Sequence, residues 1–294
     1  MSSVCLLLAT KNGAEFIESF LLSVINQDYL VTEVLVSDDS SVDCTLEIVQ
    51  RVLAGKIKFR ILAGPNLGTT QNFYHMLVES REYDHYAFAD QDDVWAPFHL
   101  SRAIKLLDLN NGVASLIFSP TTHRRGIGKC DIRFVQREFS ELIVNNPARG
   151  CTIVFNQAAK EFFLQQNWKD ILFHDWWTTI LVSLKGRVFS FRKPSVWYRE
   201  HKGQQIGRQN GISSTFEKIR RFSTSLETSF AMCEKIDSDQ QGISDINRNK
   251  ILAWEKLLQK ERLSFFQRLA LLSRLKPTAT TILRTVFTYI FLVL

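Results

Sequence analysis

One pattern recurs through the first hundred residues: a short apolar run, a polar break, and then a segment whose apolar residues recur at helical spacing. The apolar runs lie at residues 4–10, 34–36, 59–62 and 86–89, and the helical segments lie at residues 15–25, 45–53 and 72–80. Apolar runs that do not alternate with polar residues are typical of strands buried on both faces of a parallel sheet. The sequence therefore predicts an α/β fold, with helices on both faces of a mostly parallel sheet.

Polar side chains follow each predicted strand at the point where the strand ends. In parallel sheets of this kind, ligands bind at the carboxyl ends of the strands. The residues that the pattern places there are Thr10, Asn12, Asp38, Asp39, Asn66, Asp90 and Asp92. Because they come from four different strands, we expect them to converge on one edge of the sheet, which is the predicted site.

Three acids, Asp90, Asp92 and Asp93, directly follow the fourth apolar run. Like charges this close repel one another unless something positive lies among them. Carboxylates in a D-x-D arrangement suit Mg²⁺ or Mn²⁺, with phosphate oxygens completing the coordination. The alternative is an acidic loop that caps the next helix, with Asp93 as the N-cap and Pro97 in the first turn.

Composition narrows the class of protein. A chain of 294 residues suffices for one or two domains. Its net charge of +6 is compatible with nucleic acid, anionic lipid or a phosphate-bearing substrate. The five cysteines form no C-x-x-C pair, which argues against a zinc site or a disulfide framework and favours a reducing compartment. We find no dinucleotide-binding or P-loop motif, and we expect neither a signal peptide nor a clear membrane span.

Four motifs, at residues 8–13, 36–41, 66–68 and 89–95, occur in an order and spacing that resemble a family 2 glycosyltransferase of the GT-A fold. The form Asp-Gln-Asp-Asp-Val-Trp at residues 90–95 resembles the rhamnosyltransferase-type members of bacterial surface polysaccharide synthesis. The resemblance covers residues 1–205. It implies a nucleotide-diphospho-sugar transferase fold, a Rossmann-like sheet flanked by helices. A nucleotide-sugar half would occupy about residues 1–100, and an acceptor half would occupy about residues 101–205.

For the nucleotide sugar, the resemblance implies a pocket made by Ala9, Thr10, Asp38, Asp39, Asn66, Asn72 and Asp90. Asp92 is implied as the main ligand of Mg²⁺ or Mn²⁺, with Asp90 nearer the ribose. His201 would be a further metal ligand or a diphosphate contact, the alternative being a surface histidine. The physical reason for a metal is that a divalent cation offsets the diphosphate charge as the nucleotide diphosphate leaves.

The stretch at residues 173–177 resembles the segment that carries the family's catalytic carboxylate, so Asp175 is implied as the general base of an inverting transfer. Without the resemblance, Asp175 would be the N-cap of a helix over residues 176–184 whose tryptophans are core. The resemblance implies an acceptor and sugar pocket lined by Gly150, Cys151, Thr152, His174, Trp176, Trp177 and Arg199.

Some of these residues keep an alternative. Trp176 and Trp177 would stack on a sugar or pack in the core, and Arg199 would pair with phosphate or with a neighbouring acid. The resemblance implies that residues 150–152 begin a strand, the alternative being a plain turn from loop to strand. We do not expect Cys151 to act as a nucleophile, because no partnered histidine is evident.

Residues 206–294 form a different, helical region. Residues 263–275 place leucines and a phenylalanine on one face beside arginines, a basic amphipathic pattern suited to an anionic membrane surface or to docking on the rest of the chain. Residues 278–294 are strongly apolar but short for a span, so shallow membrane insertion is expected.

The resemblance implies a metal-dependent, inverting hexosyltransferase that moves L-rhamnose from dTDP-L-rhamnose to a saccharide hydroxyl on a lipid-linked acceptor, in O-antigen or capsule synthesis. A UDP-hexose or UDP-N-acetylhexosamine donor stays open. We expect the enzyme in the cytoplasm, peripheral on the inner face of the bacterial plasma membrane. The other classes considered are a nucleotidyltransferase, whose first loop would be richer in glycine, and a basic nucleic-acid-binding protein, which no motif supports.

Overall fold

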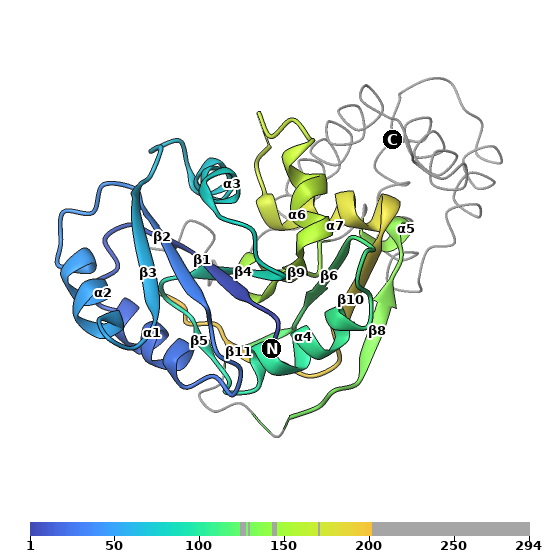
Figure 1. Ribbon diagram of the computed structural model, residues 1–294, viewed down its shortest axis with the longest axis horizontal. Coiled ribbons are helices and arrows are strands. Elements are labelled where there is room, and N and C mark those ends of the chain that lie inside the picture. Colours follow the sequence, from blue (N-terminus) through green and yellow to red (C-terminus); the bar gives the residue numbers. More distant parts are fainter. Residues whose placement is uncertain (124–127, 129, 143–145, 170, 202–294) are drawn as a thin grey trace, which may run out of the picture.

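The computed structural model describes residues 1–123, 128, 130–142, 146–169 and 171–201. In this part of the chain, helices lie against both faces of a central sheet (Figure 1). The predictions about residues 206–294 lie outside the described residues. Within the described residues, no helix is both long enough and apolar enough to cross a membrane.

The central sheet has eight strands among the described residues, in the order β3-β2-β1-β4-β9-β6-β10-β8. Their bounds are β1 Val4–Thr10, β2 Glu33–Asp38, β3 Lys58–Ala63, β4 His85–Asp90, β6 Ser115–Phe118, β8 Phe134–Arg137, β9 Val154–Asn156 and β10 Arg187–Phe191. The first four strands of the chain pair in parallel, as predicted. Strand β9 is antiparallel to both β4 and β6, and β8 is antiparallel to β10, so the second half of the sheet is mixed.

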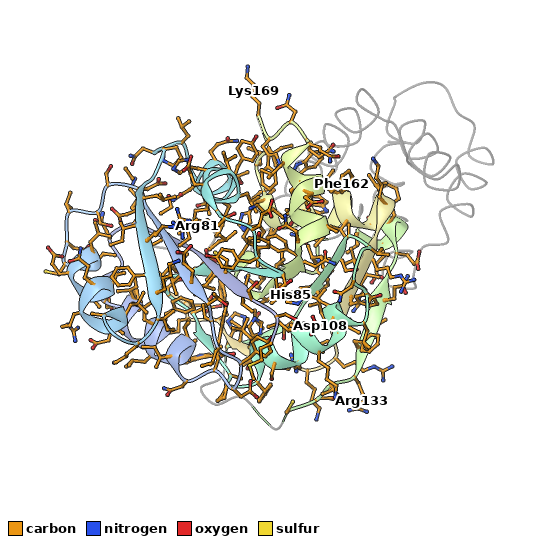
Figure 2. The ribbon with its side chains drawn as sticks, viewed as in Figure 1. Arg81, His85, Asp108, Arg133, Phe162 and Lys169 are labelled. Atoms are coloured by element: carbon orange, nitrogen blue, oxygen red, sulfur yellow. The ribbon has the colours of Figure 1, made fainter. Side chains whose placement is uncertain are left out.

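Helices form two layers because the buried strands present apolar residues alternately to the two faces. The helices are α1 Ile17–Ile25, α2 Thr45–Leu53, α3 Thr69–Glu79, α4 His99–Asp108, α5 Phe139–Leu142, α6 Gln157–Leu164 and α7 His174–Lys185. On β1, Cys5 and Leu7 face the core formed with α3, α5, α6 and α7. Leu6 and Leu8 face the core formed with α1, α2 and α4. Side chains fill the space between sheet and helices (Figure 2).

A small second sheet brings a late segment of the chain to the end of β4. Its strands are β5 Val94–Trp95, β7 Thr121–Thr122 and β11 Val196–Trp197, in the order β5-β11-β7. Strand β5 directly follows the acidic motif, and it pairs antiparallel with β11. This pairing places residues 198–201 beside the loop between β4 and β5.

The carboxyl ends of the parallel strands are level with one another. The β1–β2 ladder ends with Thr10 opposite Asp38, and the β1–β4 ladder ends with Ala9 opposite Asp90. Each of the loops after β1, β2 and β3 contains one non-glycine residue with positive φ: Asn12 (47°), Ser40 (61°) and Asn66 (56°). Backbone strain of this kind persists where surrounding contacts enforce it, often at binding sites.

Two segments beside the site differ from the first prediction made for them. Residues Gly150–Thr152 form a 3₁₀ turn, η1, which is the predicted alternative of a turn from loop to strand, and the strand itself begins at Val154. Helix α7 begins at His174 with Phe173 as its N-cap, so Asp175 lies in the first turn and is not the cap. Both differences bring side chains to the cleft described below.

Candidate functional site

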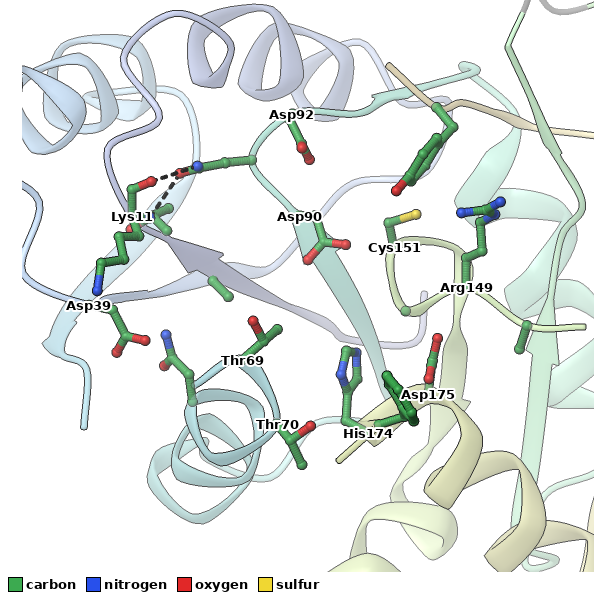
Figure 3. A pocket seen from close by; sticks show the side chains of 18 of the residues that line it. Lys11, Asp39, Thr69, Thr70, Asp90, Asp92, Arg149, Cys151, His174 and Asp175 are labelled. Atoms are coloured by element: carbon green, nitrogen blue, oxygen red, sulfur yellow. Dashed lines mark hydrogen bonds between the residues drawn. The ribbon is translucent and has the colours of Figure 1, made fainter. Parts of the chain in front are cut away.

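A cleft of about 1130 Å³ opens at the carboxyl ends of the parallel strands. Residues that follow β1, β2, β4 and β11 form one side, which we call the strand wall. Residues 146–151, which include the start of η1, and residues 172–176, which include the start of α7, form the helix wall. Helix α3 contributes Thr69, Thr70 and Asn72 between them (Figure 3).

Most of the predicted site residues line this cleft. Those that do are Ala9, Thr10, Asn12, Asp39, Asn72, Asp90, Asp92, Gly150, Cys151, His174, Asp175, Trp176 and His201. Those that do not are Asp38, Asn66, Thr152, Trp177 and Arg199. The structure therefore gathers residues from both halves of the chain into one site.

The ends of β1 and β2 are tied together by side chains. Thr10 donates its hydroxyl to Asp38 Oδ1 at 2.8 Å. Ser41 donates to the same carboxylate through its backbone N–H at 2.8 Å and its hydroxyl at 2.6 Å. Asp38 is thus held within the loop, whereas Asp39, whose N–H donates to Thr10 O, reaches the cleft.

The two predicted asparagines have different places. Asn66 donates its backbone N–H to Asp39 Oδ1 at 3.1 Å and its side-chain amide to Ser40 Oγ at 2.8 Å. Asn66 therefore holds the Asp39 carboxylate through a hydrogen bond and does not itself line the cleft. Asn72 lines the cleft, and its amide donates to Ser37 O at 3.3 Å.

Asp92 and His201 meet in the strand wall although they lie far apart in the sequence. His201 Nε2 is 2.7 Å from Asp92 Oδ2, and the imidazole stacks on Phe16 with ring centroids 4.3 Å apart. An imidazole nitrogen and a carboxylate oxygen facing each other are a ligand pair that a divalent cation accepts once the shared proton leaves. The donor set therefore fits the predicted metal.

Asp90 adds to a concentration of negative charge at the same place. Burial raises its pKa well above the usual range, and the neighbouring Asp92, Asp93 and Asp175 raise it further. Asp90, Asp93 and Cys151 each present a potential ligand atom, all within 4.8 Å of one another. Crowded acids of this kind are stabilised by a cation, which is a second reason that the site fits one.

Asp93 is not the cap of the next helix, because α4 begins at His99 and its N-cap is Phe98. Its side chain is fully buried, and neither oxygen accepts a hydrogen bond from an N–H or O–H of the described residues. Burial, then repulsion from Asp92, raises its pKa to about 7, and the Cys151 thiol partly opposes the shift. The position of the Phe98 cap excludes the capping alternative. A buried carboxylate beside another acid is disfavoured in its charged form, so we count Asp93 with the acidic cluster.

Asp175 stands on the helix wall, across the cleft from Asp90 (Figure 3). Its Oδ1 accepts the Trp176 N–H at 2.6 Å. Burial raises the pKa of Asp175 to about 6, opposed by hydrogen bonds from Trp176, Asn146 and Gly150 and by the charge of Arg149. A carboxylate with a raised pKa is a stronger base than a solvated one and is still charged at neutral pH.

His174, directly before Asp175, is 8% exposed and lines the cleft. It packs on Phe73 with ring centroids 4.2 Å apart, and its Nε2 has no hydrogen-bond partner among the described residues. Burial lowers the pKa of His174 to about 3, so the imidazole is neutral. A Cβ at Gly150 would lie 2.3 Å from Nε2, which explains why glycine stands there.

Of the two tryptophans after Asp175, only one lines the cleft. Trp176 is 4% exposed, lines the cleft, and donates its indole N–H to Leu142 O at 2.7 Å. Trp177 is 1% exposed and lies in the core without lining the cleft. Both tryptophans belong to the same core cluster, so the core alternative is confirmed for both, and stacking on a sugar stays a prediction for Trp176, which also lines the cleft.

The 3₁₀ turn η1 presents only part of the predicted sugar pocket. Gly150 and Cys151 line the cleft, whereas Thr152 donates its hydroxyl to Arg149 O at 2.9 Å. Trp95 donates its indole N–H to Cys151 O at 3.0 Å and so ties the turn to β5. Burial and the neighbouring acids raise the pKa of Cys151 well above its usual value, which is unfavourable for a nucleophile.

Arg199 does not line the cleft; it contacts the backbone of the loop between β4 and β5, which we call the acidic loop. Its guanidinium donates to the backbone carbonyls of Asp92, Asp93 (3.4 Å) and Phe16 (3.1 Å), and to Ser19 Oγ at 2.7 Å. This placement indicates that Arg199 holds the loop after β4 against the start of α1. Pairing with phosphate stays a prediction that the placement does not favour.

Several cleft residues were not singled out from the sequence. They include Lys11, Glu15, Phe16, Thr69, Thr70, Gln91, Asn146, Arg149, Leu172, Phe173 and Tyr198. Lys11 and Gln91 are neighbours of predicted residues, and their place inside two motifs was a usable signal. Arg149, which lies 4.3 Å from the Tyr198 ring centroid, is positioned by tertiary contacts that no local pattern indicates.

Comparison with known proteins identifies the family of this chain. The sequence profile of the family described as "Glycosyl transferase family 2" matches residues 5–177, which is more than half of the chain. A relative from Shigella flexneri, described as dTDP-rhamnosyl transferase RfbG, is 28% identical over 230 residues, covering 72% of this chain and 78% of the relative.

Solved structures share the fold. The crystal structure of S. aureus TarS 1-349 in complex with UDP-GlcNAc has a TM-score of 0.60 at 17% identity and covers 93% of this chain and 80% of that chain. The mannosyltransferase PcManGT from Pyrobaculum calidifontis, in complex with GDP-Man and Mn²⁺, has a TM-score of 0.52 at 16% identity, covering 93% and 86%. At this identity the likeness shows a common fold.

Proposed function

Because the chain belongs to glycosyl transferase family 2, we propose that it transfers L-rhamnose from dTDP-L-rhamnose to a saccharide hydroxyl, with inversion at the anomeric carbon. Residues up to about 100 would bind the nucleotide sugar, and residues from about 101 to 205 would bind the acceptor. The choice of donor is supported by the similarity to the Shigella dTDP-rhamnosyl transferase.

The observation that carries the proposal is the opposition of two kinds of acid across one cleft. The strand wall holds a crowded set, Asp90, Asp92 and Asp93, beside His201. The helix wall holds a single acid, Asp175, whose pKa burial raises to about 6. Glycosyl transfer from a nucleotide diphosphate needs both: charge compensation at the leaving group and a base at the attacking hydroxyl.

On the strand wall, Asp92 and His201, with Asp90 beside them, would hold Mg²⁺ or Mn²⁺. A bound divalent cation supplies positive charge that stabilises the diphosphate leaving group. Thr10 and Asp39 of the strand wall and Asn72 of α3 also line the cleft, and they would contact the nucleoside. This division leaves Asp175 free for the chemistry at the acceptor.

On the helix wall, Asp175 would accept the proton of the acceptor hydroxyl as its oxygen attacks the anomeric carbon. The new glycosidic bond forms while the bond from the anomeric carbon to the diphosphate breaks, and dTDP leaves. One base and one displacement give inversion. His174, neutral and next to the base, would contact the sugar, and Trp176 would pack against it.

The acceptor that we propose is a saccharide carried on a lipid, as in O-antigen or capsule synthesis, at the inner face of the bacterial plasma membrane. The apolar sequence of residues 278–294 and the basic amphipathic pattern of residues 263–275 support this part of the proposal. A UDP-hexose or UDP-N-acetylhexosamine is the alternative donor, which the shared fold with the UDP-GlcNAc complex of TarS keeps open.

The test is a donor panel assayed with the full chain, Mn²⁺ and membrane extract that supplies acceptors. dTDP-L-rhamnose is compared with UDP-glucose, UDP-galactose and UDP-GlcNAc by the release of nucleotide diphosphate and the labelling of lipid-extractable saccharide. We expect transfer from dTDP-L-rhamnose above all others. Preference for a UDP sugar would replace the donor, and no transfer or hydrolysis of any donor would contradict the activity.

A further inference from the structure

A side chain continues the β1–β4 ladder after its backbone pairing stops. The last paired residues are Ala9 and Asp90. Beyond them, the Lys11 N–H donates to Gln91 Oε1 at 3.0 Å, and Gln91 Nε2 donates to Lys11 O at 2.8 Å, the two dashed lines at Lys11 in Figure 3. A primary amide has the same donor and acceptor as a peptide group, so Gln91 makes one more rung of the ladder.

Gly13 leaves the space that this amide occupies. A Cβ built at residue 13 would lie 2.0 Å from Gln91 Oε1, 2.3 Å from its Cδ and 2.9 Å from its Nε2, and these are its three nearest atoms. The φ of Gly13 is not among the positive values, so an alanine is compatible with the backbone there. The atoms that an added methyl group at residue 13 would meet first therefore all belong to the Gln91 side chain.

The loop after β1 is also tied on its other side. The Asn12 N–H donates to Ser41 Oγ at 2.8 Å, and Asn12 Oδ1 accepts the Val42 N–H at 2.9 Å. These bonds join the loop to the one after β2, which carries Asp39. The loop after β1 is thus bonded both to the loop after β2 and to the loop between β4 and β5. The Gln91 side chain makes the hydrogen bonds to the second of these.

From this geometry we infer that Gln91 is a positioning residue. It acts through the Lys11 backbone to fix the loop after β1, which would contact the nucleotide, relative to Asp92. The inference rests on the proposed function, because it concerns how the same cleft binds its nucleotide diphosphate. A ligand that contacts both loops at once binds more tightly when their separation is fixed beforehand. Asparagine is one methylene shorter, and a glutamate carboxylate has no hydrogen to donate to Lys11 O, so glutamine alone fits both bonds.

The test is a double-mutant cycle of Gln91→Ala and Gly13→Ala, read by calorimetry of dTDP binding in Mn²⁺. Each single variant should weaken binding about tenfold, the effect of losing two neutral hydrogen bonds that hold the loop. The double variant should bind no more weakly than Gln91→Ala, because the added methyl group has nothing to displace once the amide is gone. Additive losses, or unchanged affinity in Gln91→Ala, would overturn the inference.

Hydrogen exchange at residues 11–14 reads the same contact without any ligand. Both single variants should exchange faster there than the parent chain. Unchanged exchange in Gln91→Ala would contradict the inference that Gln91 holds the loop after β1. The matched control is Gln71→Ala, which loses a 2.7 Å bond to Trp168 O outside the cleft and should keep both parental readings. Failure of the parent chain to bind any nucleotide would count against the proposed function. Hydrogen exchange at residues 11–14 would still show whether Gln91 holds the loop after β1.

Discussion

The strand wall and the helix wall of the cleft hold their acids in different ways. In the strand wall, polar groups follow neighbouring parallel strands and bond to one another, as Thr10 does to Asp38 and Gln91 does to Lys11. In the helix wall, Asp175 is a single acid, and His174 beside it is neutral with an unbonded Nε2 among the described residues. The strand wall gathers several acids at one place, whereas the helix wall holds one buried acid that accepts hydrogen bonds from its own wall.

This difference suggests two roles: the strand wall for binding the nucleotide diphosphate and the helix wall for the chemical step. A network of acids around one point favours a ligand that brings positive charge, so changes there should act on binding of the nucleotide diphosphate. Asp175 lies apart from the acidic cluster, so changes there should act on the chemical step and leave donor binding intact. Variants of the two walls should therefore separate the two quantities.

The largest effect is expected for Asp92→Ala in the strand wall. The change removes the carboxylate that His201 contacts at 2.7 Å and so removes a metal ligand that we propose. We expect kcat/KM to fall by about 10⁴-fold, since charge compensation at the diphosphate is lost together with binding. Initial rates over a range of Mn²⁺ concentrations measure this. Rates that match the parent chain at every concentration would remove Asp92 from the site.

The second effect is expected for Asp175→Asn in the helix wall. The amide keeps the shape of the carboxylate but accepts no proton, so kcat should fall by about 10³-fold. The KM for the donor should change by less than about threefold, because the residue does not contact the nucleotide in this account. Steady-state kinetics give both values. A rise in KM with unchanged kcat would place Asp175 in donor binding and erase the contrast between the walls.

A smaller effect is expected for Gly150→Ala. The added Cβ would lie 2.3 Å from His174 Nε2, so the imidazole must move and shift the start of α7 with it. Displacing the base by a fraction of an ångström should lower kcat by roughly 10- to 100-fold. Gly128→Ala is the control, because its Cβ would meet nothing within 4 Å. Parental kcat in Gly150→Ala would show that His174 does not help to position Asp175.

The smallest effect is a pH dependence from the helix wall. Burial raises the pKa of Asp175 to about 6, so the base is charged above that pH and becomes protonated below it. At saturating donor and Mn²⁺, kcat should be nearly level above about pH 7 and about tenfold lower at pH 5. The residual activity of Asp175→Asn should not show this step. A level profile down to pH 5 in the parent chain would mean that another group takes the proton.

The strand wall was largely predictable from the sequence. Parallel strands place their ends at one edge, so the polar residues after each apolar run had to converge, and Thr10, Asp39, Asp90 and Asp92 do. The sequence could not separate residues in the cleft from those that support it. Asp38 and Asn66 bond within the loops, and Arg199 reaches backbone carbonyls from behind, because these roles depend on side-chain directions set by the folded loops.

The helix wall was predictable only through the family resemblance. Its chemistry depends on burial, which a single sequence does not report. The neutral state of His174, the raised pKa of Asp175 and the need for glycine at position 150 all follow from contacts between α7, η1 and the sheet. Local pattern favoured a capping Asp175, and tertiary packing overrode it, whereas the local alternative of a turn at residues 150–152 is what the structure has.

Calorimetry of dTDP binding in the presence of Mn²⁺, for the parent chain, Asp92→Ala and Asp175→Asn, tests the division between the walls most directly. The account predicts equal dissociation constants for the parent chain and Asp175→Asn, within about twofold, and loss of Mn²⁺-dependent binding in Asp92→Ala. Equal weakening in both variants, or parental binding by Asp92→Ala, would contradict it.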